Sequence, residues 1–246
     1  MTQLQWDGCV NVRDVGGLAA EGGRQTRAGV LVRADNIQEL SPAGWDALVG
    51  YGVRRIVDLR LVAELEPERL QPVELIHHSV LGEWDAETQA RFDAWMAATP
   101  LEETASYLTG SYLEFLDRFH DRFAAAVGLV AEVPDGAVVV HCRGGTDRTG
   151  LATALALRAS GVDPSAIALD YSLSEANLVP RQAAWLARAE SPEEAHRMRL
   201  LQLTPAVAMA DVLAGVDERY GSAAGYLEAG GVDPRALARL RDRLLA

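Results

Sequence analysis

The segment from Pro134 to Gly161 limits the possible folds of this chain more than any other feature. The apolar run AVVV at 137–140 leads into the loop HCRGGTDRTG, and the loop leads into the alanine-rich run LATALALRAS. A short buried strand, a loop with two glycines and a helix together form the unit from which parallel sheets are built. The segment therefore predicts an α/β fold, in which further strands flank this one and helices cover the sheet.

The rest of the chain agrees, because strand-like and helix-like stretches alternate through most of the first 160 residues. Further strands are predicted at 29–35, 53–60 and 74–81, and helices from Pro42 to Gly52, from Glu87 and after Pro100. The last third is nearly all helical in pattern, with starts marked by Pro164, Pro180, Pro192, Pro205 and Pro234. We expect one domain over residues 1–246, with a central, mostly parallel sheet of about four to five strands, flanking helices and a helical C-terminal third.

Composition places this domain among proteins without a membrane span. No apolar run reaches the roughly 18 residues of a membrane-spanning helix, and the first residues lack the basic start and apolar run of a signal peptide. Cys9 and Cys142 are the only cysteines, so the sequence offers no disulfide framework and fits a reducing compartment. We expect a cytoplasmic location.

Charge narrows the classes of partner. The sequence has 35 acidic and 23 basic residues, and its net charge of −12 disfavours nucleic acid and anionic membranes. Every basic residue is arginine, which excludes Schiff-base chemistry on lysine and the lysine of a nucleotide P-loop. Any anion must therefore bind at a local site.

The loop at 141–150 provides such a site. Its backbone N–H groups and those of the first helical turn should form an anion-binding nest, for which Gly144 and Gly145 permit positive φ angles. At the mouth of this nest, the helix end and Arg148 should hold Cys142 as a thiolate. Arg148 can bind two phosphate oxygens at once, and the hydroxyl of Thr149 could donate to the thiolate.

HCRGGTDRTG resembles the His-Cys-x5-Arg-Ser/Thr signature of the protein tyrosine phosphatase superfamily. The segments NVRDVGGL at 11–18, LVRAD at 31–35, YGVRRIVDLR at 51–60 and RYGSAAGYLEAGGV at 219–232 are similar, in order and spacing, to an atypical bacterial branch that includes lipid-active members. The resemblance implies two-step phosphomonoester hydrolysis without metal or cofactor, through a cysteinyl-phosphate on Cys142, with inorganic phosphate as product. The substrate phosphate is expected to bind Arg148 and the loop residues Arg143, Gly144, Gly145, Thr146 and Thr149.

The acid that protonates the leaving oxygen is harder to assign. The larger tyrosine phosphatases use an aspartate in a Trp-Pro-Asp loop, which this sequence lacks. In the resembling branch an aspartate directly before the loop arginine serves, which corresponds to Asp147. Asp58 ends the strand VRRIVD and should lie at the same edge of the sheet, where it could be a second acid, orient Arg148 or pair with neighbouring arginines.

Residues outside the catalytic set are also assigned expected roles around the site. The resemblance implies that His141 hydrogen-bonds the loop backbone and that the helical segment 83–112 is a lid over the site. Arg13 and Asp14 could anchor the loop from the side or belong to a turn with Gly16 and Gly17. Cys9 could form a disulfide with an oxidised Cys142, or be a core thiol.

We predict a metal-independent phosphatase that acts on phosphotyrosine in proteins, since a phenol leaves more easily than an alkyl alcohol and a weakly placed acid then suffices. Thr146 stands where branch members with phosphoinositide activity carry a lysine, which weakens a lipid interpretation. The alternatives are a dual-specificity or phosphoinositide phosphatase, a rhodanese-like sulfurtransferase, and an inactive module that binds phosphorylated partners.

Overall fold

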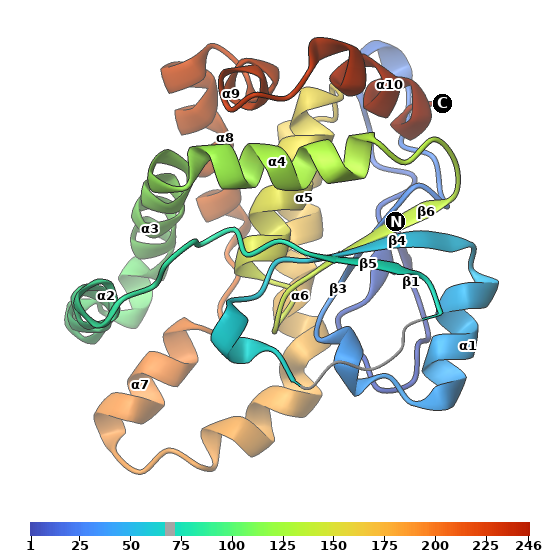
Figure 1. The fold of residues 1–246 in the computed structure, drawn as a ribbon. Helices are drawn as coiled ribbons and strands as arrows, with labels where there is room; N and C mark the ends of the chain where they lie inside the picture. The colour runs from blue at the N-terminus through green and yellow to red at the C-terminus, as the bar shows by residue number, and fades with distance from the viewer. Residues whose placement is uncertain (67–71) are drawn as a thin grey trace.

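The structure, a computed structural model, describes residues 1–66 and 72–246. In these residues six strands form one sheet in the order β1-β2-β3-β6-β4-β5 (Figure 1). The strands are β1 (Thr2–Gln3), β2 (Arg13–Asp14), β3 (Leu31–Ala34), β4 (Val53–Asp58), β5 (Glu74–His77) and β6 (Ala137–His141).

The central strands β3, β6, β4 and β5 run parallel, while β2 pairs antiparallel with β3 and β1 antiparallel with β2. The predicted α/β class and mostly parallel sheet are confirmed. The prediction omits β1 and β2, because strands of two residues are too short to leave an alternating pattern. β5 is also shorter than predicted and ends at His77.

Ten α-helices lie in the described part of the chain. They are α1 (Pro42–Gly50), α2 (Ala86–Ala98), α3 (Thr104–Arg118), α4 (His120–Ala131), α5 (Asp147–Ala159), α6 (Pro164–Leu186), α7 (Pro192–Leu200), α8 (Ala206–Tyr220), α9 (Ala223–Ala229) and α10 (Pro234–Leu244). Of the short 3-10 turns, η3 (Val62–Glu64) follows β4, and η4 (Leu101–Glu103) joins α2 to α3.

Most of the predicted helix starts are correct for a local reason. Ser41, Asp163, Ser191 and Asp233 each cap the first turn through a side-chain oxygen, and each is followed by a proline at the first helical position. Pro180 is the exception, because it lies inside α6 instead of starting a helix. The helix continues through it although the proline has no N–H to donate, so tertiary packing outweighs the local signal.

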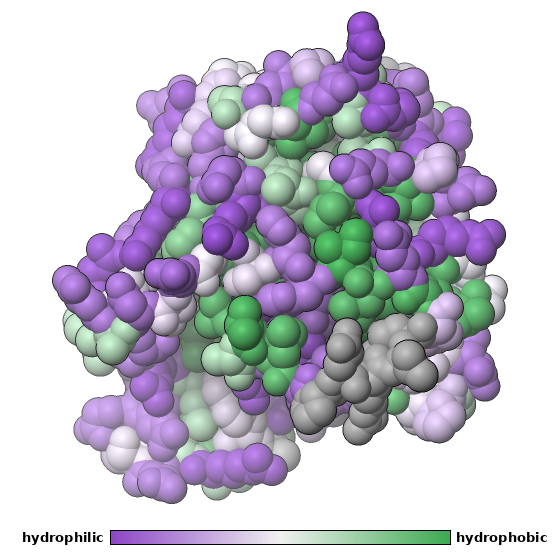
Figure 2. All heavy atoms as spheres, in the orientation of Figure 1, coloured by the Kyte–Doolittle hydropathy of each residue, from purple (hydrophilic) through white to green (hydrophobic). Residues whose placement is uncertain are grey.

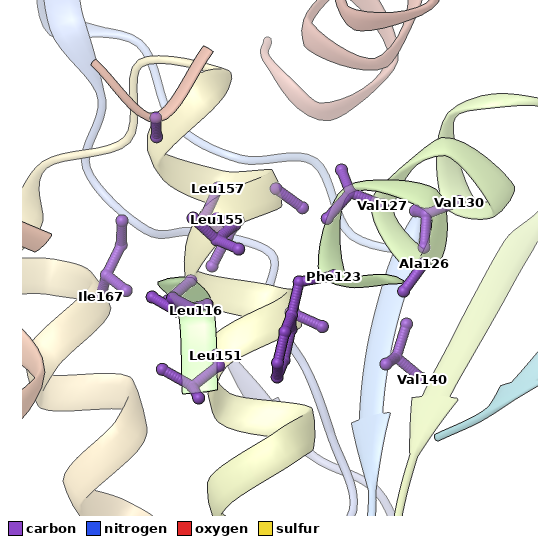
Figure 3. Close-up of a cluster of buried hydrophobic side chains, with 14 of the residues drawn as sticks. Leu116, Phe123, Ala126, Val127, Val130, Val140, Leu151, Leu155, Leu157 and Ile167 are labelled. Atoms are coloured by element: carbon purple, nitrogen blue, oxygen red, sulfur yellow. The ribbon is translucent and has the colours of Figure 1, made fainter. Parts of the chain in front are cut away.

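The two faces of the sheet carry cores of different size. Val57, Val138 and Val140 point into the larger core, which α4, α5 and the C-terminal helices complete, as Figure 3 shows for Phe123 and its neighbours. Ile56 and Val139 point into the smaller core beneath α1. Alternate strand residues thus face opposite cores, as expected for a sheet that is covered on both sides.

The surface is largely polar on the face drawn in Figure 2, where hydrophobic side chains gather over the edge strand β5. Within residues 1–66 and 72–246, no helix combines the length and apolar character that crossing a membrane requires. The carboxyl end of β6 and the start of α5 lie near η3, on the side of the sheet where α2, α3 and α7 extend (Figure 1).

Candidate active site

The loop between β6 and α5 has the backbone that an anion site requires. Gly145 has a φ of 69°, and a Cβ at this position would lie 2.6 Å from the carbonyl oxygen of Ala34. Only glycine fits such a close approach in this conformation. Thr146 is the N-cap residue of α5 but its side chain makes no capping hydrogen bond, which leaves first-turn N–H groups of α5 available to an anion.

The predicted positive φ of Gly144 is wrong. In the described chain its φ lies outside the left-handed region, unlike that of Gly145. The carbonyl oxygen of Gly144 instead accepts a hydrogen bond of 3.0 Å from the side chain of Asn11, which fixes the peptide in an ordinary conformation. Glycine is needed at one position of this loop for its φ angle, not at two.

Three hydrogen bonds tie the carbonyl oxygens of the loop to the surrounding scaffold. Asn11 binds Gly144, Arg33 binds the carbonyl of Gly145 at 2.8 Å, and the backbone N–H of Asn36 binds the carbonyl of Arg143 at 3.1 Å. These bonds hold the loop in one shape before any ligand arrives, which lowers the entropy cost of binding.

A buried ionic cluster supports this anchoring. Asp170 on α6 accepts from Arg13 at 2.7 Å and from Arg33 at 2.7 Å, and all three side chains are about 1% exposed. Burial alone would raise the pKa of Asp170, but the two guanidinium groups hold it below its usual value. Burial and the neighbouring Arg33 lower the pKa of Arg13 to about 10. Breaking one partner would leave a buried charge without compensation, which is strongly destabilising.

Of the two residues predicted to anchor the loop from the side, only Arg13 contacts a residue that binds the loop. Arg13 supports the loop indirectly, because its Nη1 donates to Asn11 at 2.6 Å. Asp14 instead accepts from the backbone of Gly16 at 2.6 Å and of Gly29 at 2.7 Å, and from the hydroxyl of Tyr51. Asp14 therefore closes a turn beside β2, which is the alternative interpretation of its motif.

Cys142 follows directly after β6 and is 2% exposed. The hydroxyl of Thr149, predicted to donate to its sulfur, is fully buried and has no hydrogen-bond partner within the described residues. Arg143 is exposed at the rim of the loop. Burial alone would lower the pKa of Arg148, but its hydrogen bond to Glu64 keeps the pKa above its usual value.

Glu64, at the end of η3, is the main ionic partner of Arg148. The carboxylate accepts from Nη1 and, at 3.0 Å, from Nη2 of the guanidinium. Burial would raise the pKa of Glu64, yet the Arg148 hydrogen bonds keep it below the usual value. A guanidinium has five N–H donors, so the Nε edge of Arg148 stays open to an anion. This role could not be predicted from the sequence, because Glu64 is one of several glutamates close together in the chain.

Asp58 lies on a neighbouring strand end, as predicted, but it pairs with a different arginine. Its carboxylate binds Arg60 through Nε at 2.9 Å and Nη2 at 2.6 Å, and it is 1% exposed. Burial would raise the pKa of Asp58, but the Arg60 hydrogen bonds hold it below its usual value. Arg60 in turn donates to the carbonyl of Glu64 at 3.3 Å. Within the described residues, contacts connect Asp58 to Arg148 by way of Arg60 and Glu64.

His141 is completely buried next to this ion pair. Its Nδ1 lies 3.2 Å from the carbonyl oxygen of Cys142, in agreement with the expected contact to the loop backbone. Burial lowers the pKa of His141 to about 4. The imidazole is therefore neutral at pH 7, and its 3.6 Å contact with the carboxylate of Asp58 is not a charged pair.

Asp147 is the first residue of α5 and lines a partly open cavity. Its carboxylate accepts hydrogen bonds from the hydroxyl of Tyr112 on α3 and, at 3.0 Å, from that of Thr146. Asp147, Arg148 and Glu64 line a cavity of about 230 Å³. The opposite wall is mainly apolar and comes from the predicted lid segment and its neighbours, including Trp84, Phe92, Met96, Tyr107 and Phe115.

Two further pairs of residues bear on the sequence predictions. The imidazoles of His77 and His78 hydrogen-bond the carbonyl oxygens of Arg60 and Arg122, respectively, so both have ordinary structural partners.

Cys9 and Cys142 are free thiols. Cys9 donates weakly to the carbonyl of Asn36 at 3.5 Å, and burial raises the pKa of its thiol. Its thiolate is therefore strongly disfavoured at neutral pH.

The comparisons with known proteins agree with the geometry. A family described as the tyrosine phosphatase family matches residues 4–246. The chain is 31% identical to a Cupriavidus necator protein named provisionally as a tyrosine-protein phosphatase, over 99% of this chain and 88% of that protein. It is 28% identical to the triple specificity protein phosphatase PtpB of Mycobacterium tuberculosis, over the full length of both. A tyrosine-protein phosphatase of Nostoc commune is 27% identical, over 88% of this chain and 74% of that protein.

Proposed function

Because this chain belongs to the tyrosine phosphatase family, we propose that it hydrolyses phosphotyrosine in proteins and uses Cys142 as the nucleophile. The observation that carries the proposal is the arrangement at the start of α5, where the loop that begins with Cys142 leads into an uncapped helix end, and Asp147 and Arg148 of that helix line the cavity. The helix end and the arginine suit a phosphate, and the adjacent thiol suits attack on it.

The proposed reaction has two steps. The thiolate of Cys142 attacks phosphorus, the bond from phosphorus to the ester oxygen breaks, and Asp147 donates a proton to the departing oxygen. In the second step Asp147 accepts a proton from water, the oxygen of that water attacks the cysteinyl-phosphate, and inorganic phosphate leaves as the thiolate reforms. Arg148 holds the phosphate oxygens in both steps. A thiol nucleophile must stay reduced, which fits the expected cytoplasmic location.

The apolar wall of the cavity supports an aromatic leaving group. The rings of Trp84 and Phe92 stack with centroids 5.3 Å apart, and those of Phe92 and Phe115 lie 5.0 Å apart. A phenyl ring gains more from such a wall than the short polar side chain of phosphoserine. Among the described lining residues Arg148 is the only basic one, which favours a single phosphate over a polyphosphorylated head group.

We also propose that residues 83–112 act as a lid of the single domain 1–246. Cys142 is almost fully buried, so a substrate reaches it only if covering residues move. The segment contains α2, η4 and the first part of α3, and Trp84, Phe92 and Met96 from it line the cavity. Its end is anchored, since Tyr112 is 1% exposed. Motion would therefore be confined to α2 and the turn after it.

A second candidate is a phosphatase of broader specificity. It is favoured by the full-length similarity to a protein named as a triple specificity phosphatase. Thr146 and the scarcity of basic groups in the cavity weigh against phosphoinositides. Assays with phosphotyrosyl and phosphoseryl peptides and with phosphoinositide vesicles, all with EDTA present, would separate the two candidates.

The nucleophile is tested by replacing each cysteine in turn. Cys142→Ser should abolish turnover of p-nitrophenyl phosphate and phosphotyrosyl peptide but keep vanadate binding, because the helix end and Arg148 remain. Cys9→Ser is the matched control and should retain activity. If Cys142→Ser kept more than about a tenth of the wild-type rate, nucleophilic catalysis by Cys142 would be wrong. Persulfide formation from thiosulfate without phosphatase turnover would instead identify a sulfurtransferase.

A further inference from the structure

Two buried tyrosines connect separate helices to Asp147. The hydroxyl of Tyr112 on α3 donates to Oδ1 of Asp147, and the hydroxyl of Tyr171 on α6 lies 2.8 Å from that of Tyr112. Both tyrosines are 1% exposed. Their rings meet edge to face, at 89° with centroids 6.2 Å apart, which fixes the positions of the two hydroxyls.

The direction of this chain of hydrogen bonds follows from the chemistry of its end. An ionised carboxylate only accepts, so the single proton of the Tyr112 hydroxyl points at Asp147. The oxygen of Tyr112 is then free to accept, and Tyr171 is the donor to it. Burial raises the pKa of both phenols, which keeps both hydroxyls protonated as donors.

The chain also determines which oxygen of Asp147 can carry a proton. A proton on Oδ1 would reverse the chain and leave the hydroxyl proton of Tyr171 without an acceptor among the described residues, so a protonated Asp147 keeps Oδ1 as its acceptor and places the proton on Oδ2. The neighbour of Oδ2 is the hydroxyl of Thr146 at 3.0 Å. A threonine hydroxyl can donate or accept, so it permits both protonation states of Asp147.

We propose that Tyr112, held in place by Tyr171, is a positioning residue that fixes the carboxyl group of Asp147 and directs its acidic proton, on Oδ2, to the leaving oxygen. The proposal rests on the proposed function, since it assumes that Asp147 is the general acid. It links α3 and α6 to the chemical step at the start of α5. Tyr112 lines the cavity beside Asp147, and the proposal gives it no part in the proton transfer other than holding that carboxyl group.

The test is Tyr112→Phe, which keeps the ring and removes only the hydroxyl. For phenyl phosphates with poor leaving groups, kcat should fall about 10- to 100-fold, part of the usual effect of general acid catalysis. For activated leaving groups the change should be below about threefold, because these need little protonation. Tyr171→Phe should give the same pattern with a smaller loss. Vanadate affinity should be unchanged in both variants.

Tyr226→Phe is the matched control. It removes an equally buried hydroxyl, which donates to the carbonyl of Leu116 at 2.8 Å on the far part of α3. It should lower stability without altering the dependence on leaving group. Thermal melting of all three variants shows whether each is folded under the assay conditions.

Coupling to the acid is measured by combining Tyr112→Phe with Asp147→Asn. If Tyr112 acts through Asp147, its replacement should have almost no effect on kcat once Asp147 is gone. An equal loss in both backgrounds, or an equal loss for good and poor leaving groups, would overturn the proposal while leaving phosphatase activity established. Absence of turnover by the wild-type protein would instead refute the proposed function.

Discussion

At the scale of single residues, partners distinguish the two carboxylates that the sequence offers as acids. Asp147 lines the cavity and receives its hydrogen bonds from neutral hydroxyls. Asp58 is held on both carboxylate oxygens by a guanidinium and does not line the cavity. A carboxyl group that faces the substrate can transfer a proton, whereas one locked in a buried ion pair can only position its neighbours.

The prediction from this contrast uses Asp147→Asn and Asp58→Asn as a matched pair. Asp147→Asn should slow phenyl phosphates with poor leaving groups by roughly 10²- to 10⁴-fold and activated ones far less, since only the former need an acid. Asp58→Asn removes the charge that holds Arg60, and the positions of Glu64 and then Arg148 should become less well defined. Because Arg148 binds the phosphate, KM should rise and kcat should fall with little dependence on leaving group. Both variants are assayed on one series of substituted phenyl phosphates. A steep dependence confined to Asp58→Asn would exchange the two roles.

Sequence could predict only part of this site, for a physical reason. Cys142, Asp147 and Arg148 lie within one loop, so their spacing alone brings them together. Glu64 and Tyr112 are 84 and 35 positions away from their partners in the chain. Their roles depend on how η3 and α3 pack against α5, and such long-range contacts leave no periodic signal in the sequence.

At the scale of elements, the turn from β6 into α5 depends on one glycine. Gly145→Ala would pay the cost of a left-handed φ and would also press its Cβ against the carbonyl of Ala34, at 2.6 Å. Gly22→Ala is the matched control, because Gly22 has a φ of 70° and no atom within 4 Å of an added Cβ. The difference in destabilisation between the two variants therefore measures the cost of the contact between the added Cβ and β3.

We expect Gly22→Ala to destabilise the protein by about 1 kcal/mol and Gly145→Ala by clearly more. Gly145→Ala should also weaken vanadate binding, because a displaced Gly145 shifts the N–H groups at the start of α5. Urea denaturation and vanadate titration measure the two effects. Equal destabilisation of both variants, with vanadate affinity retained, would show that the loop relaxes without cost.

The elements that sequence predicted well are those with local signals. The strands β3, β4 and β6 are short stretches rich in apolar residues, and the helices at Pro164, Pro192 and Pro234 begin at a capping side chain followed by proline. β2 is defined by its pairing with β3, and β1 by its pairing with β2, rather than by their own residues. The passage of α6 through Pro180 likewise depends on packing, which a local rule cannot foresee.

At the scale of the whole molecule, the groups that hold the active-site loop also hold elements of the fold together. Asn11, which precedes β2, and Arg33 of β3 hold the loop, and Asp170 of α6 binds Arg13 of β2 and Arg33. Anions that bind the loop should therefore stabilise the folded state, as any ligand specific for that state does. The buried His141 connects the same loop to the response of the whole molecule to acid.

The pKa of His141 predicts how stability changes with pH. Burial lowers it from 6.5 to about 4, so between these pH values the unfolded chain binds one proton more than the folded chain does. The free energy of unfolding therefore falls as pH drops through this window, by about 1.4 kcal/mol per pH unit and about 3 kcal/mol in total. Below about pH 4 the folded protein also binds the proton and this contribution stops changing.

His141→Asn keeps a side chain that can hydrogen-bond near the carbonyl of Cys142 but cannot titrate. Its stability should be lower than that of the wild type at pH 7, and the difference should narrow by about 3 kcal/mol towards pH 4. Urea denaturation of both proteins at half-unit steps from pH 7 to pH 4 measures this difference, to which Asp58 also contributes because its carboxylate lies 3.6 Å from the imidazole. Parallel stability curves for the two proteins would show that His141 is protonated equally in the folded and unfolded states.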